Sequence, residues 1–68
     1  MNVSIKIREL RKAAGLSQEE LAKRAGVGLR FIRELEQGRR NPSLGKIEQV
    51  LALFGHHVEV VRDDEHTA

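Results

Sequence analysis

Two short helical segments separated by a very tight turn limit what this chain can fold into. The earlier segment begins at Ser17, whose hydroxyl can cap the first turn while the Glu20 carboxylate satisfies another amide, and it ends at Gly26. The next helical pattern, at about residues 29–37, starts directly after Gly28. Because the turn has only three residues, the two helices must cross steeply. The earlier helix has about eight residues, too few to be stable alone, so it must pack against its neighbours.

Two further helices are predicted on either side of this pair. Residues 3–14 have apolar side chains at helical spacing and are followed by Gly15, a residue typical of helix ends. Ser43 is placed to cap a fourth helix that runs to about Phe54. The apolar faces of these two helices are formed by Val3, Ile7, Leu10 and Ala14, and by Leu44, Ile47, Val50, Leu51 and Phe54. The sequence therefore predicts an all-α domain over residues 1–55.

The pattern changes after Gly55, because residues 57–62 are β-branched and roughly alternating, which predicts a short C-terminal strand within residues 56–62. A single strand leaves its backbone amides and carbonyls unpaired, unless residues 2–7 supply a second strand. The simplest partner is the same strand of a second copy, paired antiparallel about a two-fold axis. We therefore expect a homodimer, whose interface would comprise Ile5, Leu53, Val58, Val60 and Val61.

Charge is distributed unevenly along the chain. Lys and Arg number 12 and Asp and Glu 10, for a formal net charge of +2, but three of the acids lie in residues 63–68. The remainder has 12 basic and seven acidic residues, a net charge of +5, which favours a polyanion as partner. Residues 63–68 are predicted to form a disordered acidic tail.

The composition disfavours several kinds of site. Without cysteine the chain can form neither a disulfide nor a thiolate metal site. The histidines His56, His57 and His66 lack the spacing of a tetrahedral site, and the serines lie where helix caps belong rather than in a triad. We therefore expect no metal, no cofactor and no enzymatic activity. No apolar run approaches the roughly 18 residues of a membrane span, which indicates no membrane association and a cytoplasmic location.

Periodicity identifies the outward face of the helix at 29–37. On a helical wheel Phe31, Ile32 and Leu35 fall on one side and define the buried face. The opposite side carries Arg30, Arg33, Glu34 and Gln37. Such side chains can hydrogen-bond to base-pair edges in a major groove, although any surface helix also has a polar face. The tight turn before this helix and the basic loop after it favour DNA binding.

Glu36 lies at the flank of the buried face, where a lone carboxylate would be costly. It therefore needs a cation nearby. Arg11 lies beside the core positions of the first helix, so we expect Arg11 and Glu36 to form a structural salt bridge.

Motifs spread over residues 3–54 are typical of one family. These motifs are Arg11-Lys12, Gly15-Leu16-Ser17-Gln18-Glu19-Glu20-Leu21-Ala22, Gly26-Val27, Ile32, Leu35-Glu36 and Gly38-Arg39-Arg40-Asn41-Pro42-Ser43-Leu44. In them the chain resembles the phage-repressor and Cro-like helix-turn-helix family, also called the XRE family. The resemblance implies a lambda-repressor-like bundle of four to five helices, whose third helix enters the major groove of DNA.

The resemblance also implies roles for single residues. The base-reading residues would be Leu29, Arg30, Arg33 and Glu34, together with Gln37 from the outward face. The phosphate-binding residues would be Gln18, Arg39, Arg40 and Asn41, and Gln18 would also brace the recognition helix. Gly28 departs from the family pattern, because a hydroxyl or amide side chain usually caps this helix. Glu34 could accept from a cytosine amino group, or it could orient Arg30 and repel phosphate, and both roles stay open.

A narrower resemblance to HipB-like antitoxins rests on residues 26–36, Gly45-Lys46-Ile47, Val50-Leu51 and the strand after Gly55. It implies pairing of the C-terminal strands across a dimer, repression of the protein's own operon and binding to a HipA-like serine/threonine kinase toxin. The sequence thus predicts a sequence-specific double-stranded DNA-binding repressor, nucleoid-associated, acting as an autoregulating antitoxin. The alternatives are a stand-alone XRE-family regulator, a restriction-modification controller without a toxin, and an interaction module that has lost DNA binding.

Overall fold

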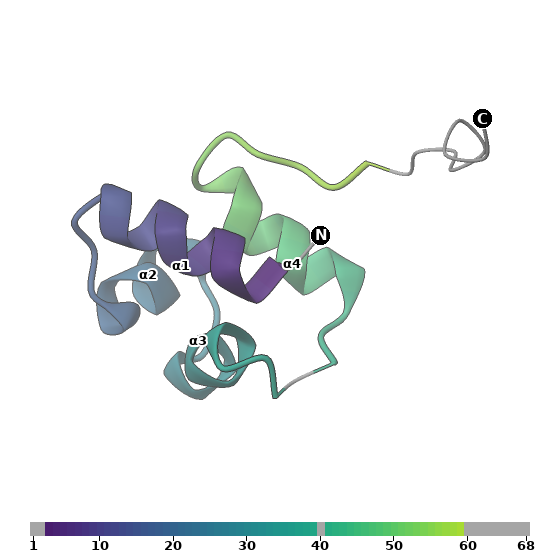
Figure 1. The fold of residues 1–68 in the computed structure, drawn as a ribbon, viewed down its shortest axis with the longest axis horizontal. Helices are drawn as coiled ribbons and strands as arrows, with labels where there is room; N and C mark the ends of the chain where they lie inside the picture. The colour runs from purple at the N-terminus through teal and green to yellow at the C-terminus, as the bar shows by residue number, and fades with distance from the viewer. Residues whose placement is uncertain (1–2, 40, 60–68) are drawn as a thin grey trace.

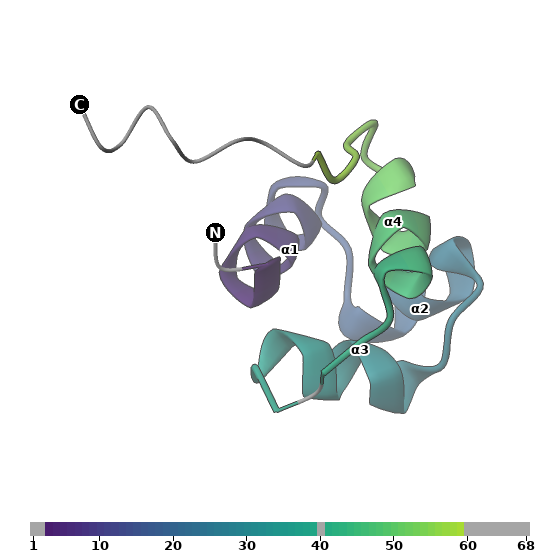
Figure 2. The same ribbon diagram turned by 90° about the vertical axis from the view of Figure 1, so that its right-hand side faces the viewer.

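The computed structural model describes residues 3–39 and 41–59, and within these ranges the fold is entirely helical. Its helices are α1 (Val3–Ala13), α2 (Gln18–Ala25), α3 (Leu29–Glu36) and α4 (Leu44–Ala52). Figure 1 and Figure 2 show α3 at one end of the molecule, while the segment after α4 passes over the opposite end. The predicted small all-α bundle is therefore confirmed, with four helices in the described part of the chain.

The helix ends follow from local hydrogen bonding. The Ser17 hydroxyl accepts from the backbone amide of Glu20 at 3.0 Å, and the Glu20 carboxylate accepts from the amide of Ser17 at 2.8 Å, so the predicted capping box is present. Gly26 ends α2 in a left-handed conformation at φ +73°, which a side chain would disfavour. Ser43 caps α4 by accepting from a backbone amide at 3.3 Å. Serine side chains thus accept from amides at the start of α2 and α4, and the backbone amide of Gly26 donates to a carbonyl at the end of α2.

All four helices contribute to a single apolar core. Its buried members are Ile7, Leu21, Ala22, Ala25, Phe31, Ile32, Leu35, Val50 and Leu51, and none of the described residues buried there is polar. α2 packs chiefly against α3, while α1 supports α3 and α4 supports α2. Because helices of eight to eleven residues are marginal by themselves, this shared core holds α2 and α3 in place.

Several expectations about the ends of the helices were wrong. Helical spacing places Ala14 and Leu44 on apolar faces, but Ala14 is exposed and Leu44 is 55% exposed. α1 ends at Ala13, so Ala14 lies beyond its packed face, and Leu44 is the first residue of α4, ahead of the part that enters the core. α4 also ends before Phe54, which follows in a turn and still packs against the core.

The segment after α4 differs from the predicted strand. Residues 56–59, its described part, contain no strand, although Val58 packs against the core. α1 already includes residues 3–7, so the alternative that residues 2–7 act as a second strand was wrong. Among residues 3–39 and 41–59 these backbone groups therefore have no neighbouring strand on which to form a ladder. Val60, Val61 and the acidic tail at 63–68 lie outside the described residues.

Candidate nucleic-acid interface

The orientation of α3 is set by its buried side. Phe31, Ile32 and Leu35 are each at most 5% exposed, as the helical wheel predicts, and they turn the opposite side of the helix toward solvent. On that side the Arg30 side chain is 88% exposed, and Arg33 is exposed as well. We call Arg30, Arg33, Glu34 and Gln37 the outer face of α3.

On the outer face Arg30 is paired with Glu34 and Gln37 is exposed, whereas the neighbouring Leu29 is half-buried. The Nε atom of Arg30 lies 3.4 Å from Oε2 of Glu34, one helical turn along. Such an exposed pair contributes only about 0.3–0.5 kcal/mol, so Arg30 can leave it for another acceptor at little cost. Gln37 is exposed at the C-cap of α3. Leu29, a predicted base-reading residue, is half-buried and packs against the core, so much of its side chain faces inward.

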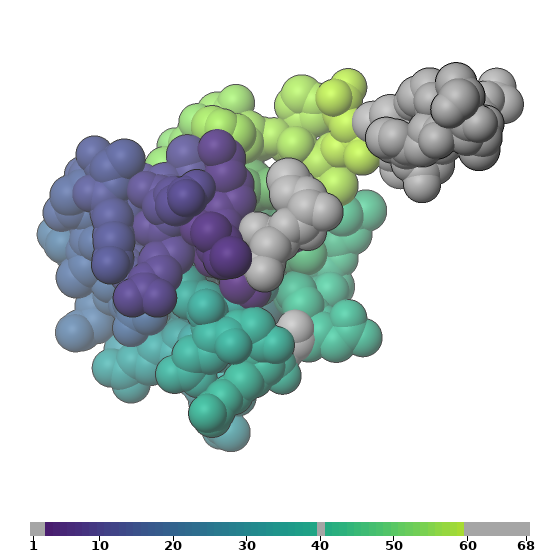
Figure 3. Space-filling model, viewed as in Figure 1, coloured from purple at the N-terminus to yellow at the C-terminus, as the bar shows by residue number. Residues whose placement is uncertain are grey.

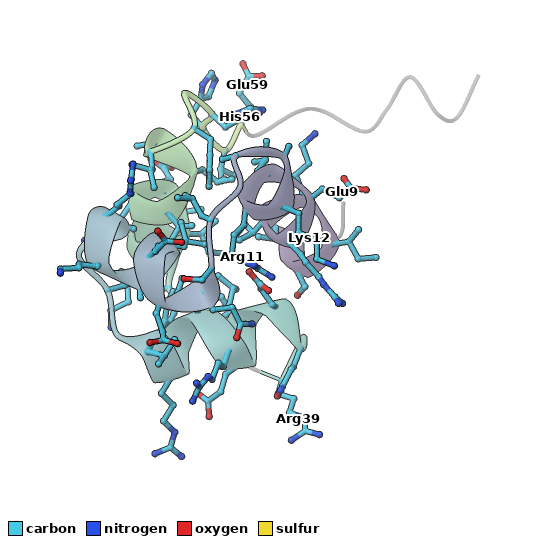
Figure 4. The ribbon with its side chains drawn as sticks, turned by 90° about the vertical axis from the view of Figure 1, so that its left-hand side faces the viewer. Glu9, Arg11, Lys12, Arg39, His56 and Glu59 are labelled. Atoms are coloured by element: carbon cyan, nitrogen blue, oxygen red, sulfur yellow. The ribbon has the colours of Figure 1, made fainter. Side chains whose placement is uncertain are left out.

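Further polar side chains continue from α3 into the following loop. Gly38 closes the helix at φ +70°, and the backbone amide of Arg39 donates to the carbonyl of Glu34 at 3.0 Å. Figure 4 shows the Arg39 side chain extending away from the body of the molecule at the α3 end. Asn41 is exposed, while Arg40 lies outside the described residues. Figure 3 shows α3 and this loop forming one end of the molecular surface.

A buried ion pair joins α1 to the C-terminal end of α3. The Arg11 guanidinium donates to both carboxylate oxygens of Glu36, at 2.7 and 3.0 Å, and the side chains are 12% and 3% exposed. Arg11 also donates to the carbonyl of Leu16 at 2.9 Å. Figure 4 shows Arg11 pointing into the interior between α1 and α3. The predicted partner of Glu36 therefore lies in direct contact with it.

Gln18 completes this network from α2. Its side-chain nitrogen donates to Oε1 of Glu36 at 3.1 Å, which links the first residue of α2 to the last residue of α3. The hydrogen bond to Glu36, and to a lesser degree the charge of that carboxylate, raises the pKa of Arg11, against the lowering effect of burial. Arg11 therefore stays charged throughout the pH range in which such a domain is folded. Three helices are thereby fixed relative to one another at the end of α3.

Two interactions of α4 were not predicted from the sequence. Gln49 donates through its side-chain nitrogen to the carbonyls of Ala25 and Gly26, at 2.8 and 3.2 Å. The ammonium of Lys46 lies 5.3 Å from the centroid of the Phe31 ring. Both residues are exposed and polar, so periodicity places them on an ordinary solvated face and gives no signal of these contacts.

Two kinds of feature are absent from the described residues, a cluster of metal ligands and a membrane-spanning helix. They contain no group of three histidine, cysteine or acidic side chains placed to hold a metal ion. His56 and His57 are exposed, Figure 4 shows His56 at the end of the molecule opposite α3, and His66 lies outside the described part of the chain. None of the helices that the structure describes is long and apolar enough to cross a membrane.

Comparisons with known proteins agree with this arrangement of helices. A helix-turn-helix family model matches residues 7–60. An HTH-type transcriptional regulator of Sinorhizobium fredii, y4mF, is 44% identical over 59 residues, which cover 87% of this chain and 78% of that protein. No solved structure matches.

Two relatives are named as phage repressors. The immunity repressor protein of Bacillus phage phi105 is 32% identical over 96% of this chain and 45% of its own length. The cryptic phage CTXphi transcriptional repressor RstR of Vibrio cholerae is 38% identical over 91% of this chain and 57% of its own length. The chain therefore spans about half the length of each of these two repressors. Members of the helix-turn-helix (XRE) family are DNA-binding transcriptional regulators and not enzymes. These matches, together with the capped α2, the three-residue turn and α3, show that the chain belongs to this family.

Proposed function

We propose that this protein is a sequence-specific, double-stranded DNA-binding transcriptional repressor. The observation that carries the proposal is the outer face of α3, where two exposed arginines stand opposite a buried apolar side, on a helix whose C-terminal end is fixed through Glu36. An α-helix fits the major groove of B-DNA, where each base pair presents a distinct pattern of donors and acceptors. Repression, rather than activation, is supported by the names of the two phage relatives.

The proposed interface divides its work between two sets of residues. Arg30 and Arg33 donate to guanine O6 and N7, which discriminates against a wrong base by about 1–3 kcal/mol for each bidentate contact. The proposed backbone contacts come from Gln18, Arg39, Arg40 and Asn41. Contacts to phosphate fix the register of the protein on the duplex and make affinity fall with salt, but they carry no direct sequence information.

Gln18 suits a role that serves both sets. Its amide nitrogen carries two N–H donors, of which one is directed to Glu36. A phosphate bound by the other would therefore be tied through Glu36 to the end of α3. This geometry supports the bracing role that the family resemblance implies.

We also propose that the repressor acts as a homodimer formed through the C-terminal segment. Ile5 and Leu53 are 56% and 40% exposed, although both are large apolar residues. Val58 brings the segment after α4 against the core, at the end of the molecule opposite α3. A two-fold axis there would leave both α3 helices available to successive major grooves about 34 Å apart. A mass of one chain at micromolar concentration, measured by sedimentation, would refute the dimer.

Selection from a randomised duplex library tests the DNA-binding proposal. The chain should enrich a pseudo-palindromic sequence. Arg33→Ala should relax the preference at one position of each half-site, whereas Arg39→Ala should weaken binding to all sequences alike. Lys12→Ala is the matched control, because Lys12 is a cation that extends from α1 rather than from α3 or its loop. If Arg39→Ala removes the preference and Arg33→Ala leaves it intact, the division of roles is wrong.

The antitoxin role would add a kinase partner to this repressor. The repressor and regulator names of the reported relatives support a stand-alone regulator equally well. Two observations would decide between them: whether the neighbouring reading frame encodes a kinase-like protein, and whether that protein copurifies with this chain.

A further inference from the structure

The turn between α2 and α3 is held from outside by α4. The Gln49 side chain donates to the carbonyl of Ala25, the last residue of α2, at 2.8 Å, and to that of Gly26, the first residue of the turn, at 3.2 Å. Carbonyls at a helix C-terminus have no partner within their own helix. Gln49 therefore satisfies two such groups with one amide, across 24 and 23 positions of sequence.

The position of Gln49 is itself well fixed. The next residue, Val50, is fully buried, and Leu51 is only 3% exposed, so the core sets where this turn of α4 lies. A Cβ atom added at Gly26 would come within 3.2 Å of the Gln49 nitrogen, which shows how closely the amide approaches the turn. The contact is therefore a close one between a core-anchored helix and the backbone of the turn.

The α2–turn–α3 unit is thus held at both of its ends. At the end away from the turn, the Glu36 carboxylate binds Gln18 and Arg11, which joins the start of α2 to the end of α3. At the turn itself, Gln49 binds the carbonyls of Ala25 and Gly26, where the chain reverses. Small rotations of these peptide groups would change the angle between α2 and α3, because only three residues separate the helices.

We infer that Gln49 is a positioning residue for DNA recognition, which fixes the angle of α3 against α2 and so the register of its outer face in the groove. The inference rests on the proposed function, in which α2 contacts phosphate while α3 contacts bases. Gln49 itself touches no base and acts only through the turn. Its loss should therefore reduce discrimination between DNA sequences more than it reduces overall affinity for DNA.

The test compares two affinities in the full-length chain. One probe is the duplex that the unaltered chain selects from a randomised library, and the other is a scrambled duplex of equal length and composition. Gln49→Ala should lower the ratio of the two affinities by about three- to tenfold, the worth of one neutral hydrogen bond. Gln49→Glu should lower it at least as far, since a carboxylate would face two carbonyl oxygens, whereas Gln49→Lys keeps donors in place and should largely restore it.

Glu48→Ala is the matched control, because it alters the neighbouring exposed residue of α4 and should leave the affinity ratio unchanged. All variants are measured at a temperature where circular dichroism shows them folded. If Gln49→Ala lowers the melting temperature but keeps the affinity ratio, Gln49 is only structural and the inference is overturned.

Hydrogen exchange gives a second readout that needs no DNA. The amides of Gly26 and Val27 both donate to the carbonyl of Ala22 and report directly on the turn. They should exchange faster in Gln49→Ala than in Glu48→Ala, and equal rates would overturn the inference. If the unaltered chain selects no duplex at all, the proposed function fails, and these exchange rates alone then decide whether Gln49 holds the turn.

Discussion

The contact between Arg11 and Glu36 makes a quantitative prediction about stability. Arg11→Met leaves a carboxylate that is 3% exposed with the Gln18 amide as its remaining partner among the hydrogen bonds described above. Removing one member of a buried pair costs about 3 kcal/mol or more, since the other charge stays desolvated. Glu36→Met should cost somewhat less, about 2 kcal/mol, because the longer Arg11 side chain can reach solvent. A chain of 68 residues has only about 3–10 kcal/mol of stability in all, so either loss is large.

A double-mutant cycle measures the pair itself. Replacing both residues by Met removes both buried charges, so the double variant should be about 2 kcal/mol more stable than the two single losses predict when added. Urea unfolding followed by far-UV circular dichroism gives the four free energies. If Arg11→Met is already unfolded in buffer, recovery of helical signal in the double variant reports the same coupling.

The pair of Arg30 and Glu34 provides the control cycle. It joins the same residue types on α3, but at 3.4 Å and with side chains 88% and 29% exposed. Its coupling should be about 0.5 kcal/mol or less and should weaken with added salt, while that of the buried pair should change little. Additive losses for Arg11 and Glu36, or equal couplings for the two pairs, would refute the structural role assigned to the buried contact.

Three further predictions concern the capping box, the glycines and the phosphate contacts. The pKa of Glu20 is lowered, chiefly by the hydrogen bond from the backbone of Ser17, so the stabilising effect of this carboxylate is present above the ordinary glutamate pKa and is lost as pH falls through the lower folded-state value. Glu20→Gln should therefore make the melting temperature fall less steeply as the pH is lowered, and an unchanged fall would contradict this role. Gly26 has φ +73°, so Gly26→Ala should lower the free energy of unfolding in urea by about 1–2 kcal/mol. Gly45 lies in a helix with open space where its Cβ would be, so Gly45→Ala should raise that free energy by about 0.5–1 kcal/mol. Effects of the same sign for the two variants would contradict this explanation. Arg39→Ala should reduce the slope of log affinity against log salt by about one in fluorescence anisotropy, and an unchanged slope would remove Arg39 from the phosphate contacts.

Local signals in the sequence predicted most of the helical framework. Ser17 with Glu20, and Gly26 after them, determine the ends of α2 through contacts within a few residues, and such contacts are visible in the sequence. The need of Glu36 for a cation was also visible, because its place on the helical wheel puts a carboxylate beside the buried face. Arg11 is indicated as its partner because it is a cation beside the core position Leu10 of the first helix.

Other features depend on tertiary placement and could not be predicted in this way. Leu44 fits the apolar face of α4 by spacing, but it is the first residue of the helix and is 55% exposed. Gln49 looks like a solvated residue, since its two acceptors belong to a distant turn. The strand predicted at 56–62 would need a partner strand for its ladder, and none of the described residues supplies one. These differences share one cause, which is that spacing reports the face of an element but not what lies opposite it.

Duplexes that contain 7-deazaguanine test whether arginines on the outer face of α3 contact guanine in the major groove. The modified base keeps Watson–Crick pairing but lacks the N7 acceptor on the major-groove edge. In the selected duplex, replacing one guanine of each half-site should weaken binding of the unaltered chain by roughly ten- to a hundredfold, the worth of one hydrogen bond from a charged donor. The same base substitution should have little further effect on Arg33→Ala or on Arg30→Ala, whichever arginine contacts that guanine. Equal losses for the unaltered chain and for both variants at every guanine would contradict it.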